Sequence, residues 1–187
     1  MNIPGIYKAA FDKQKASQRQ IESSYMEWEQ VVRQIVLSEF QYLQRCAEVE
    51  GQKYYLIDRR PGAPGADQGY DQLGLHGRTV RTGNAYADEG YESEIIHPAN
   101  ISFLINKRGL LNVVLQPARS TTSTLPNEPI LIYYSYKPTS LTKLKLRQML
   151  ATYLWFERCT MFYGSRTLFD SLKLRWFSHM DARTEML

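Results

Sequence analysis

Cysteine and histidine are scarce in this chain of 187 residues, which holds two cysteines and three histidines. Cys46 and Cys159 are too few for a disulfide framework, and each lies in a helical pattern beside apolar residues, so we expect both to be buried. The histidines show none of the spacings typical of zinc sites. A metal site would need residues 59–93 to fold back and bring together Asp71, His76, Glu92, Glu94 and His97. We therefore expect no metal and no cofactor.

Long apolar runs are also missing, since no run approaches the roughly 20 residues that a membrane-spanning helix needs. The N-terminus opens with Met1 to Gly5 and enters a polar helical pattern, without the basic and then apolar layout of a secretory signal. These absences predict a soluble cytoplasmic protein with no membrane partner.

Catalytic motifs are absent as well. The chain has no Gly-x-Ser-x-Gly elbow and no Walker-type Gly-Lys-Ser/Thr ending, and Cys159 falls inside a helical pattern where a nucleophile is poorly placed. The expected core strands carry no carboxylate that could serve a metal-dependent nuclease. We therefore favour a protein without catalytic activity. The alternative is a hydrolase- or nuclease-type enzyme with a site built around His76 and Asp71.

What the sequence does contain is a helical pattern over residues 6–49 with no internal Gly or Pro. Its apolar stripe advances in steps of four and three and slips by one residue after Ile35. A continuous helix of this length would extend roughly 66 Å at about 1.5 Å per residue, further than the body of so small a domain. Either the helix breaks within residues 12–20 or its first turns project. We expect residues 1–20 to form a projecting arm. We also expect a partner interface on the apolar stripe of this helix, at Tyr7, Phe11, Tyr25 and Trp28.

The remainder predicts an α+β fold. Strands are expected at residues 54–58, 101–106, 110–116 and 129–136, with a hairpin at residues 107–109 and the last strand in a central position because its apolar run is nearly continuous. A turn and a helix N-cap are expected at residues 137–140. One helix follows from there to about residue 162 and a second over 166–177, and residues 178–187 form a frayed tail. The predicted fold is one domain over residues 1–187, with a four-stranded, mostly antiparallel sheet and both C-terminal helices packed on it.

Residues 59–93 hold seven of the eleven glycines and show no sustained periodicity. We expect a long loop after the first strand, either mobile or ordered by a partner, because structureless loops of this length are usually functional or disordered. Glycines next to Arg78 and Arg81 favour contact with an anion, since backbone amides can approach it closely.

Basic residues gather in the C-terminal part, where residues 137–187 hold nine Lys or Arg against four Asp or Glu. Lys143, Lys145 and Arg147 could neutralise phosphates, although such a set also keeps the outer face of a helix solvated. The hypothesis that best fits the whole sequence is a non-catalytic binding module. It would be a subunit of a homo-oligomer or larger complex, with a protein partner or a second copy, and with nucleic acid as a further partner through its basic C-terminal face.

Overall fold

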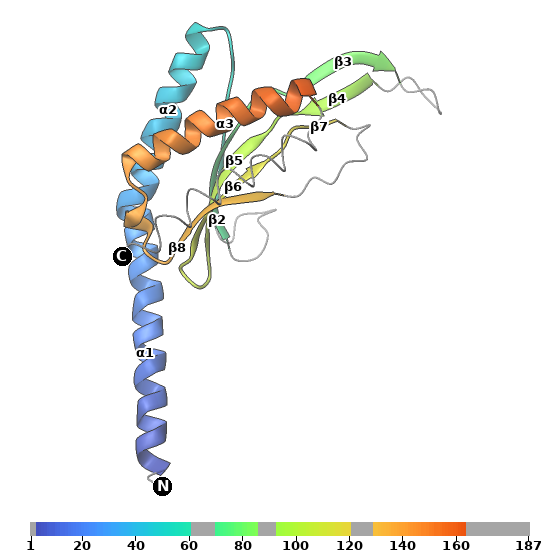
Figure 1. The fold of residues 1–187 in the computed structure, drawn as a ribbon. Coiled ribbons are helices and arrows are strands. Elements are labelled where there is room, and N and C mark those ends of the chain that lie inside the picture. Colours follow the sequence, from blue (N-terminus) through green and yellow to red (C-terminus); the bar gives the residue numbers. More distant parts are fainter. Residues whose placement is uncertain (1–2, 61–69, 86–92, 121–128, 164–187) are drawn as a thin grey trace, which may run out of the picture.

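The structure is a computed structural model that describes residues 3–60, 70–85, 93–120 and 129–163. Figure 1 shows a long helix at one side of an antiparallel sheet, with a second helix crossing it, so the predicted α+β class is confirmed. In chain order the elements are α1 (Ile3–Glu27), η1 (Trp28–Val32), α2 (Arg33–Val49), β1 (Tyr55–Arg59), β2 (Tyr70–His76), β3 (Val80–Ala85), β4 (Ser93–His97), β5 (Asn100–Asn106), β6 (Leu111–Gln116), β7 (Arg119–Ser120), β8 (Ile130–Ser135), η2 (Pro138–Ser140) and α3 (Lys143–Tyr163).

The long N-terminal helix predicted from the stripe is present, and it is continuous through α1, η1 and α2. The segment η1 is a π-helical turn, in which the backbone bonds reach one residue further than in an α-helix. The extra residue in this turn explains why the apolar stripe slips by one position, because side chains four residues apart then stay on the same side of the helix. Trp28, Val32, Val36 and Phe40 follow that spacing and are all buried.

The larger sheet has five antiparallel strands in the order β1-β2-β5-β6-β8. The predicted hairpin joins β5 to β6, and β5 occupies the centre of the sheet. Two details of the prediction are wrong: the sheet has five strands in place of four, and β8 lies at an edge. The run in β8 is apolar because Ile130, Ile132 and Tyr133 face the core, with a register shift in the pairing to β6 that lets successive residues point inward.

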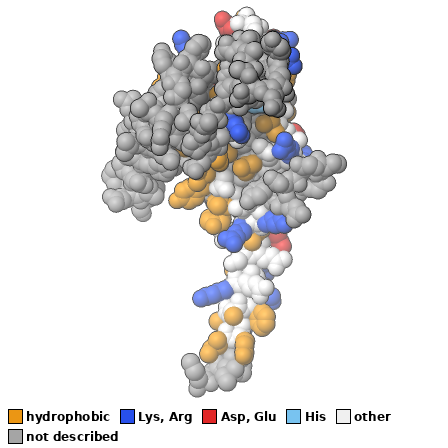
Figure 2. All heavy atoms as spheres, turned by 90° about the vertical axis from the view of Figure 1, so that its right-hand side faces the viewer, with side chains coloured by type: hydrophobic (Ala, Val, Ile, Leu, Met, Phe, Trp, Pro, Cys, Tyr) orange, Lys and Arg blue, Asp and Glu red, His pale blue; other side chains and the backbone are white. Residues whose placement is uncertain are grey.

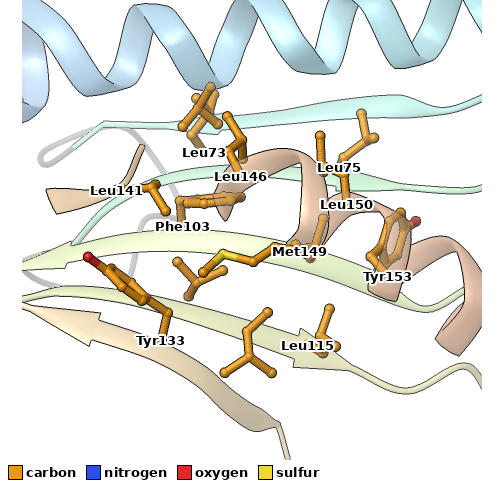
Figure 3. Packing of buried hydrophobic residues seen from close by; sticks show 14 of the residues in the cluster. Leu73, Leu75, Phe103, Leu115, Tyr133, Leu141, Leu146, Met149, Leu150 and Tyr153 are labelled. Atoms are coloured by element: carbon orange, nitrogen blue, oxygen red, sulfur yellow. The ribbon is translucent and has the colours of Figure 1, made fainter. Parts of the chain in front are cut away.

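Helices α2 and α3 contact the same sheet, at β2 and β5 respectively. Figure 3 shows Met149 and Tyr153 of α3 lying against the strands that carry Phe103 and Leu115. These side chains are all buried within one hydrophobic cluster. At about 25 cal/mol per Å² of apolar surface removed from water, such a cluster supplies the main driving force for folding.

The glycine-rich segment is not a single long loop, and this corrects the prediction. It contains β2 and β3 and the start of β4, while residues 61–69 and 86–92 lie outside the described part. In β2, Leu73 and Leu75 are buried, while Gln72 and His76 occupy the alternating positions of the opposite face. Position 74 favours glycine because a Cβ there would lie only 2.9 Å from Oγ of Ser102 on β5, too close for an ordinary contact.

A smaller sheet has the strand order β3-β4-β7. Its strands continue β2, β5 and β6 of the larger sheet, respectively, so the order of neighbouring strands is the same in both sheets. All three strands are interrupted at one level, at residues 77–79, 98–99 and 117–118, where Gly77, Pro98 and Pro117 are buried. Glycine and proline end strand pairing, so the sheet changes direction here. Figure 1 shows β3, β4 and β7 beyond the end of the larger sheet, beside the end of α3.

Helix α3 begins at Lys143, after the short helix η2 that occupies the predicted N-cap. The described part of the chain therefore contains two long helices: the continuous helix formed by α1, η1 and α2, and helix α3. The second C-terminal helix predicted over residues 166–177 and the tail at 178–187 lie outside the described residues.

Candidate functional site

The first part of α1 extends away from the rest of the molecule, and residues 6–20 are all exposed (Figure 1). We call residues 6–20 the arm. Ile6 is 53% exposed and Tyr7 and Phe11 are each 61% exposed, so large apolar side chains stand in solvent. Figure 2 shows hydrophobic side chains near the free end of the arm and Lys or Arg side chains above them. Of the four predicted interface residues, Tyr7 and Phe11 are thus available to a partner.

The other two predicted interface residues are used inside the chain. Tyr25 is partly buried against the core and its hydroxyl donates to the carbonyl of Asn106, at 2.7 Å. Trp28 is fully buried and its indole Nε1 donates to Oδ2 of Asp71, at 3.0 Å. All four predicted residues lie on one apolar stripe of the N-terminal helix, and only the part of this stripe beside the sheet is buried.

The arm is held in place where the tip of the β5–β6 hairpin meets α1. Gly109 has a positive φ of 71° and packs so closely that a Cβ there would lie 3.0 Å from Cβ of Ser24 and 3.2 Å from Cα of Ile21. The Ser24 hydroxyl donates to the carbonyl of Tyr136, at 2.6 Å. These contacts begin directly after the arm, so they set the direction in which it leaves the body.

A polar cluster surrounds the π-helical turn. Arg33 is fully buried and its Nη2 donates to Asp58 of β1, while its Nε lies 3.9 Å from Oε1 of Glu29. Arg60 Nη1 lies 3.7 Å from the other oxygen of Glu29. Asp71 of β2 is buried beneath them. The cluster therefore ties the helix to β1 and β2 with a buried cation and a buried carboxylate.

Protonation matters in this cluster. A hydrogen bond with the Asp71 carboxyl, followed by burial and the charge of Asp71, raises the pKa of Glu29, against the opposing effect of Arg60 and Arg33. In the described part of the chain, Oδ1 of Asp71 and Nε and Nη1 of Arg33 have no hydrogen-bond partner. A proton on Glu29 would supply a donor to this oxygen of Asp71, which is the physical reason why Asp71 raises the pKa of Glu29.

A second buried carboxyl lies at the bend of the sheet. Oε2 of Glu157 on α3 accepts from the Tyr54 hydroxyl at 2.7 Å, and a Cβ on Gly77 would lie 2.2 Å from Oε1. Burial raises the pKa of Glu157, while the hydrogen bond from Tyr54 opposes that shift. Glu157 was not among the residues predicted from the sequence, although it lies at helical spacing from the apolar residues of α3. The position of one carboxyl on an apolar face was the signal available.

The alternative catalytic pair, His76 and Asp71, lies on one strand but on opposite faces. Asp71 faces the helices, opposite Ile105, whereas His76 is opposite Asn100 and its ring stacks on Tyr55 with centroids 5.4 Å apart. They are five positions apart along the strand, which corresponds to about 16 Å. The two side chains therefore do not meet at a common substrate position. Nδ1 of His76 lies 2.8 Å from the Gly77 carbonyl.

The predicted basic residues of α3 make contacts within the chain. Lys143 Nζ lies 3.0 Å from Oε1 of buried Glu39, and Arg147 places Nε 2.9 Å from Oε2 of the same carboxylate. The hydrogen bond from Arg147 is the largest cause that lowers the pKa of Glu39. Lys145 Nζ stands 5.8 Å above the ring centre of Tyr133. Lys143 and Arg147 thus fasten α3 to α2.

Arg78 and Arg81 are exposed, the first just before β3 and the second within it. Among the described residues, no group of three or more His, Cys, Asp or Glu side chains is arranged to hold a metal ion. Cys46 is exposed, contrary to the expectation of burial, and the side chain of Cys159 lies outside the described part.

Comparisons with protein-family models, with curated proteins and with solved structures found no match to this chain. In the described segments, no helix combines the length and the apolar character required to cross a membrane. The geometry is therefore the basis for a functional proposal.

Proposed function

We propose that this chain is a non-catalytic binding subunit that joins a protein complex through its helical arm. The observation that carries the proposal is the exposure of Tyr7 and Phe11, each 61%, on a helix that leaves the body. Burying a large aromatic side chain contributes about 1.5–3 kcal/mol, so two such anchors support a helix-in-groove interaction. Aromatic residues are also enriched in the buried centres of protein interfaces.

The charge of the arm indicates which kind of partner fits. The arm carries four cations, Lys8, Lys13, Lys15 and Arg19, against one carboxylate, Asp12. Two arms side by side would set cation beside cation, which is unfavourable. An apolar groove with an acidic rim on a different protein offers opposite charge, so we propose a partner of that chemistry over a second copy of this chain.

The proposal is tested with a photo-crosslinking amino acid at position 7 of the full chain, expressed in its native cells. We expect one discrete adduct with a different protein. Phe11→Glu is expected to reduce its yield at least tenfold, because a carboxylate would enter the apolar groove. Ala16→Glu is the matched control, since it adds the same charge on the opposite side of the helix and should leave the yield unchanged.

Absence of an adduct, or an equal loss in both variants, would contradict the proposal. Light scattering of the isolated chain tests the choice of partner separately. We expect a monomer. A dimer that Phe11→Glu dissociates would show that the arm binds a second copy.

A further inference from the structure

Three cationic or titratable side chains share one face of the smaller sheet. Arg81 of β3 lies opposite Ile95 of β4, and His97 of β4 lies opposite Arg119 of β7. Residues directly opposite in antiparallel strands point to the same side, and so do residues two apart on one strand. Arg81, His97 and Arg119 therefore form a row across the three strands, which we call the basic row.

The basic row is exposed and has no anionic partner in the described part of the chain. Arg81, His97 and Arg119 are all exposed, and no salt bridge or hydrogen bond of their side chains is found within residues 3–60, 70–85, 93–120 and 129–163. This differs from Lys143 and Arg147, which contact Glu39.

Such a row does not stabilise the sheet by itself. Arg81 and Arg119 place two fixed positive charges on one face of a three-stranded sheet, and like charges on one face repel each other. An anion from outside the chain would remove this cost. The net charge of +4 and the sequence pI of about 9.0 also favour anionic ligands. Among the described residues on the face shown in Figure 2, more Lys and Arg than Asp or Glu side chains are seen.

We propose that the basic row binds the phosphate backbone of a single-stranded nucleic acid. Neighbouring strands lie about 4.8 Å apart and His97 lies two residues beyond Ile95 on β4, so Arg81 and Arg119 are roughly 12 Å apart on a diagonal across the sheet and can contact two phosphates of one strand. Guanidinium and imidazole groups are planar and stack on unpaired bases, which an acidic peptide does not offer. The row lies on strands and not on the arm, so it acts independently of the protein interface.

The test measures fluorescence anisotropy of a labelled 20-nucleotide single strand of mixed sequence, titrated with the full chain at several salt concentrations. The variant Arg81→Gln with Arg119→Gln should bind at least tenfold more weakly. Its slope of log affinity against log salt should fall by roughly 1.4, since each phosphate contact contributes about 0.7 for single strands. The matched control is Lys107→Gln with Arg108→Gln at the exposed hairpin tip, which removes the same charge and should bind within twofold of the original chain.

Three results would overturn the proposal: no binding at low salt, an equal loss in both double variants, or displacement of the oligonucleotide by polyglutamate at equal charge. A parallel experiment uses vesicles containing anionic lipid. Binding to these vesicles alone would assign the basic row to a membrane surface instead. The variant Arg81→Lys with Arg119→Lys guards against a folding defect. It keeps the charge but loses the planar groups, so the salt slope should persist while affinity falls.

Discussion

At the residue scale, the unusual feature is the placement of ionisable groups in the interior. Arg33 and Asp71 are buried beside the π-helical turn, and Glu157 is buried at the bend of the sheet. An unpaired buried charge costs several kcal/mol, so these groups persist because each has a partner: Asp58 for Arg33, Trp28 for Asp71, and Tyr54 for Glu157. They connect helices to strands with directional contacts that apolar packing alone does not provide.

The raised pKa of Glu29 leads to a prediction about pH. Because the pKa of Glu29 is raised in the folded chain above its ordinary value of 4.5, the folded state holds this proton more tightly than the unfolded state. The resulting stability is present below that ordinary pKa and is lost as pH rises through the folded pKa. Asp71→Asn removes the carboxylate that is the largest cause of the shift while keeping an acceptor for Trp28. We expect the free energy of unfolding of the variant to fall less between pH 4 and 7.

Urea denaturation across that pH range measures the difference. Glu22→Gln on the exposed surface of α1 is the control and should reproduce the original profile. An unchanged slope in Asp71→Asn would show that Asp71 does not raise the pKa of Glu29. Glu157 adds a pH dependence of the same sign, which is common to all three proteins and cancels in the comparison.

At the scale of elements, the hairpin between β5 and β6 decides where the arm begins. Its tip residue Gly109 lies in the left-handed region and touches the α1 backbone at Ile21. The Ser24 and Tyr25 side chains add hydrogen bonds to the strand ends at Tyr136 and Asn106. A turn between two strands thus also serves as the support of a helix.

Gly109→Ala is expected to destabilise the chain by more than the conformational cost alone. A left-handed backbone costs an alanine about 1–2 kcal/mol, and here its Cβ would also press on α1. Gly51→Ala is the matched control, since Gly51 has nearly the same φ, 72°, with nothing within 4 Å of the added Cβ. Urea unfolding should therefore show a larger loss for Gly109→Ala. Equal losses would mean that the hairpin does not support α1.

At the scale of the whole molecule, the arm and the body divide the tasks of binding and stability. The buried cluster draws on α2, α3 and the larger sheet, and none of its members lies in residues 6–20. Residues whose side chains are exposed on an isolated helix contribute little to the free energy of unfolding. The body should therefore fold without the arm.

Removal of residues 1–18 is expected to leave the melting temperature within about 2 °C of the full chain, because roughly 1 kcal/mol corresponds to 2–4 °C at this size. Trp28→Ala is the contrast: it deletes a buried aromatic side chain and should cost about 3–5 kcal/mol. Differential scanning calorimetry measures both. A large loss on truncation would show that the arm packs on the body.

The long helix, the β5–β6 hairpin and α3 could be predicted because each depends on a local pattern. The steps of four and three, the one-residue slip after Ile35 and the glycine at position 109 are all visible in sequence. Strand β2 could not be found this way. Its inward-facing residues are Asp71, Leu73 and Leu75, and glycine and polar residues lie between them. Because Asp71 is charged, the apolar period of two is hidden in the sequence. Only pairing with β1 and β5 orders this strand.

The apolar stripe on the N-terminal helix shows where local information ends. The sequence by itself determined that Tyr7, Phe11, Tyr25 and Trp28 lie on one side of one helix, because side-chain direction follows from helical geometry. Only the tertiary structure decided that Trp28 is core and Phe11 is exposed, since burial depends on whether strands distant in the chain lie alongside. The same reason separates Lys143, which contacts Glu39, from Arg81, which lies opposite the apolar Ile95 of β4.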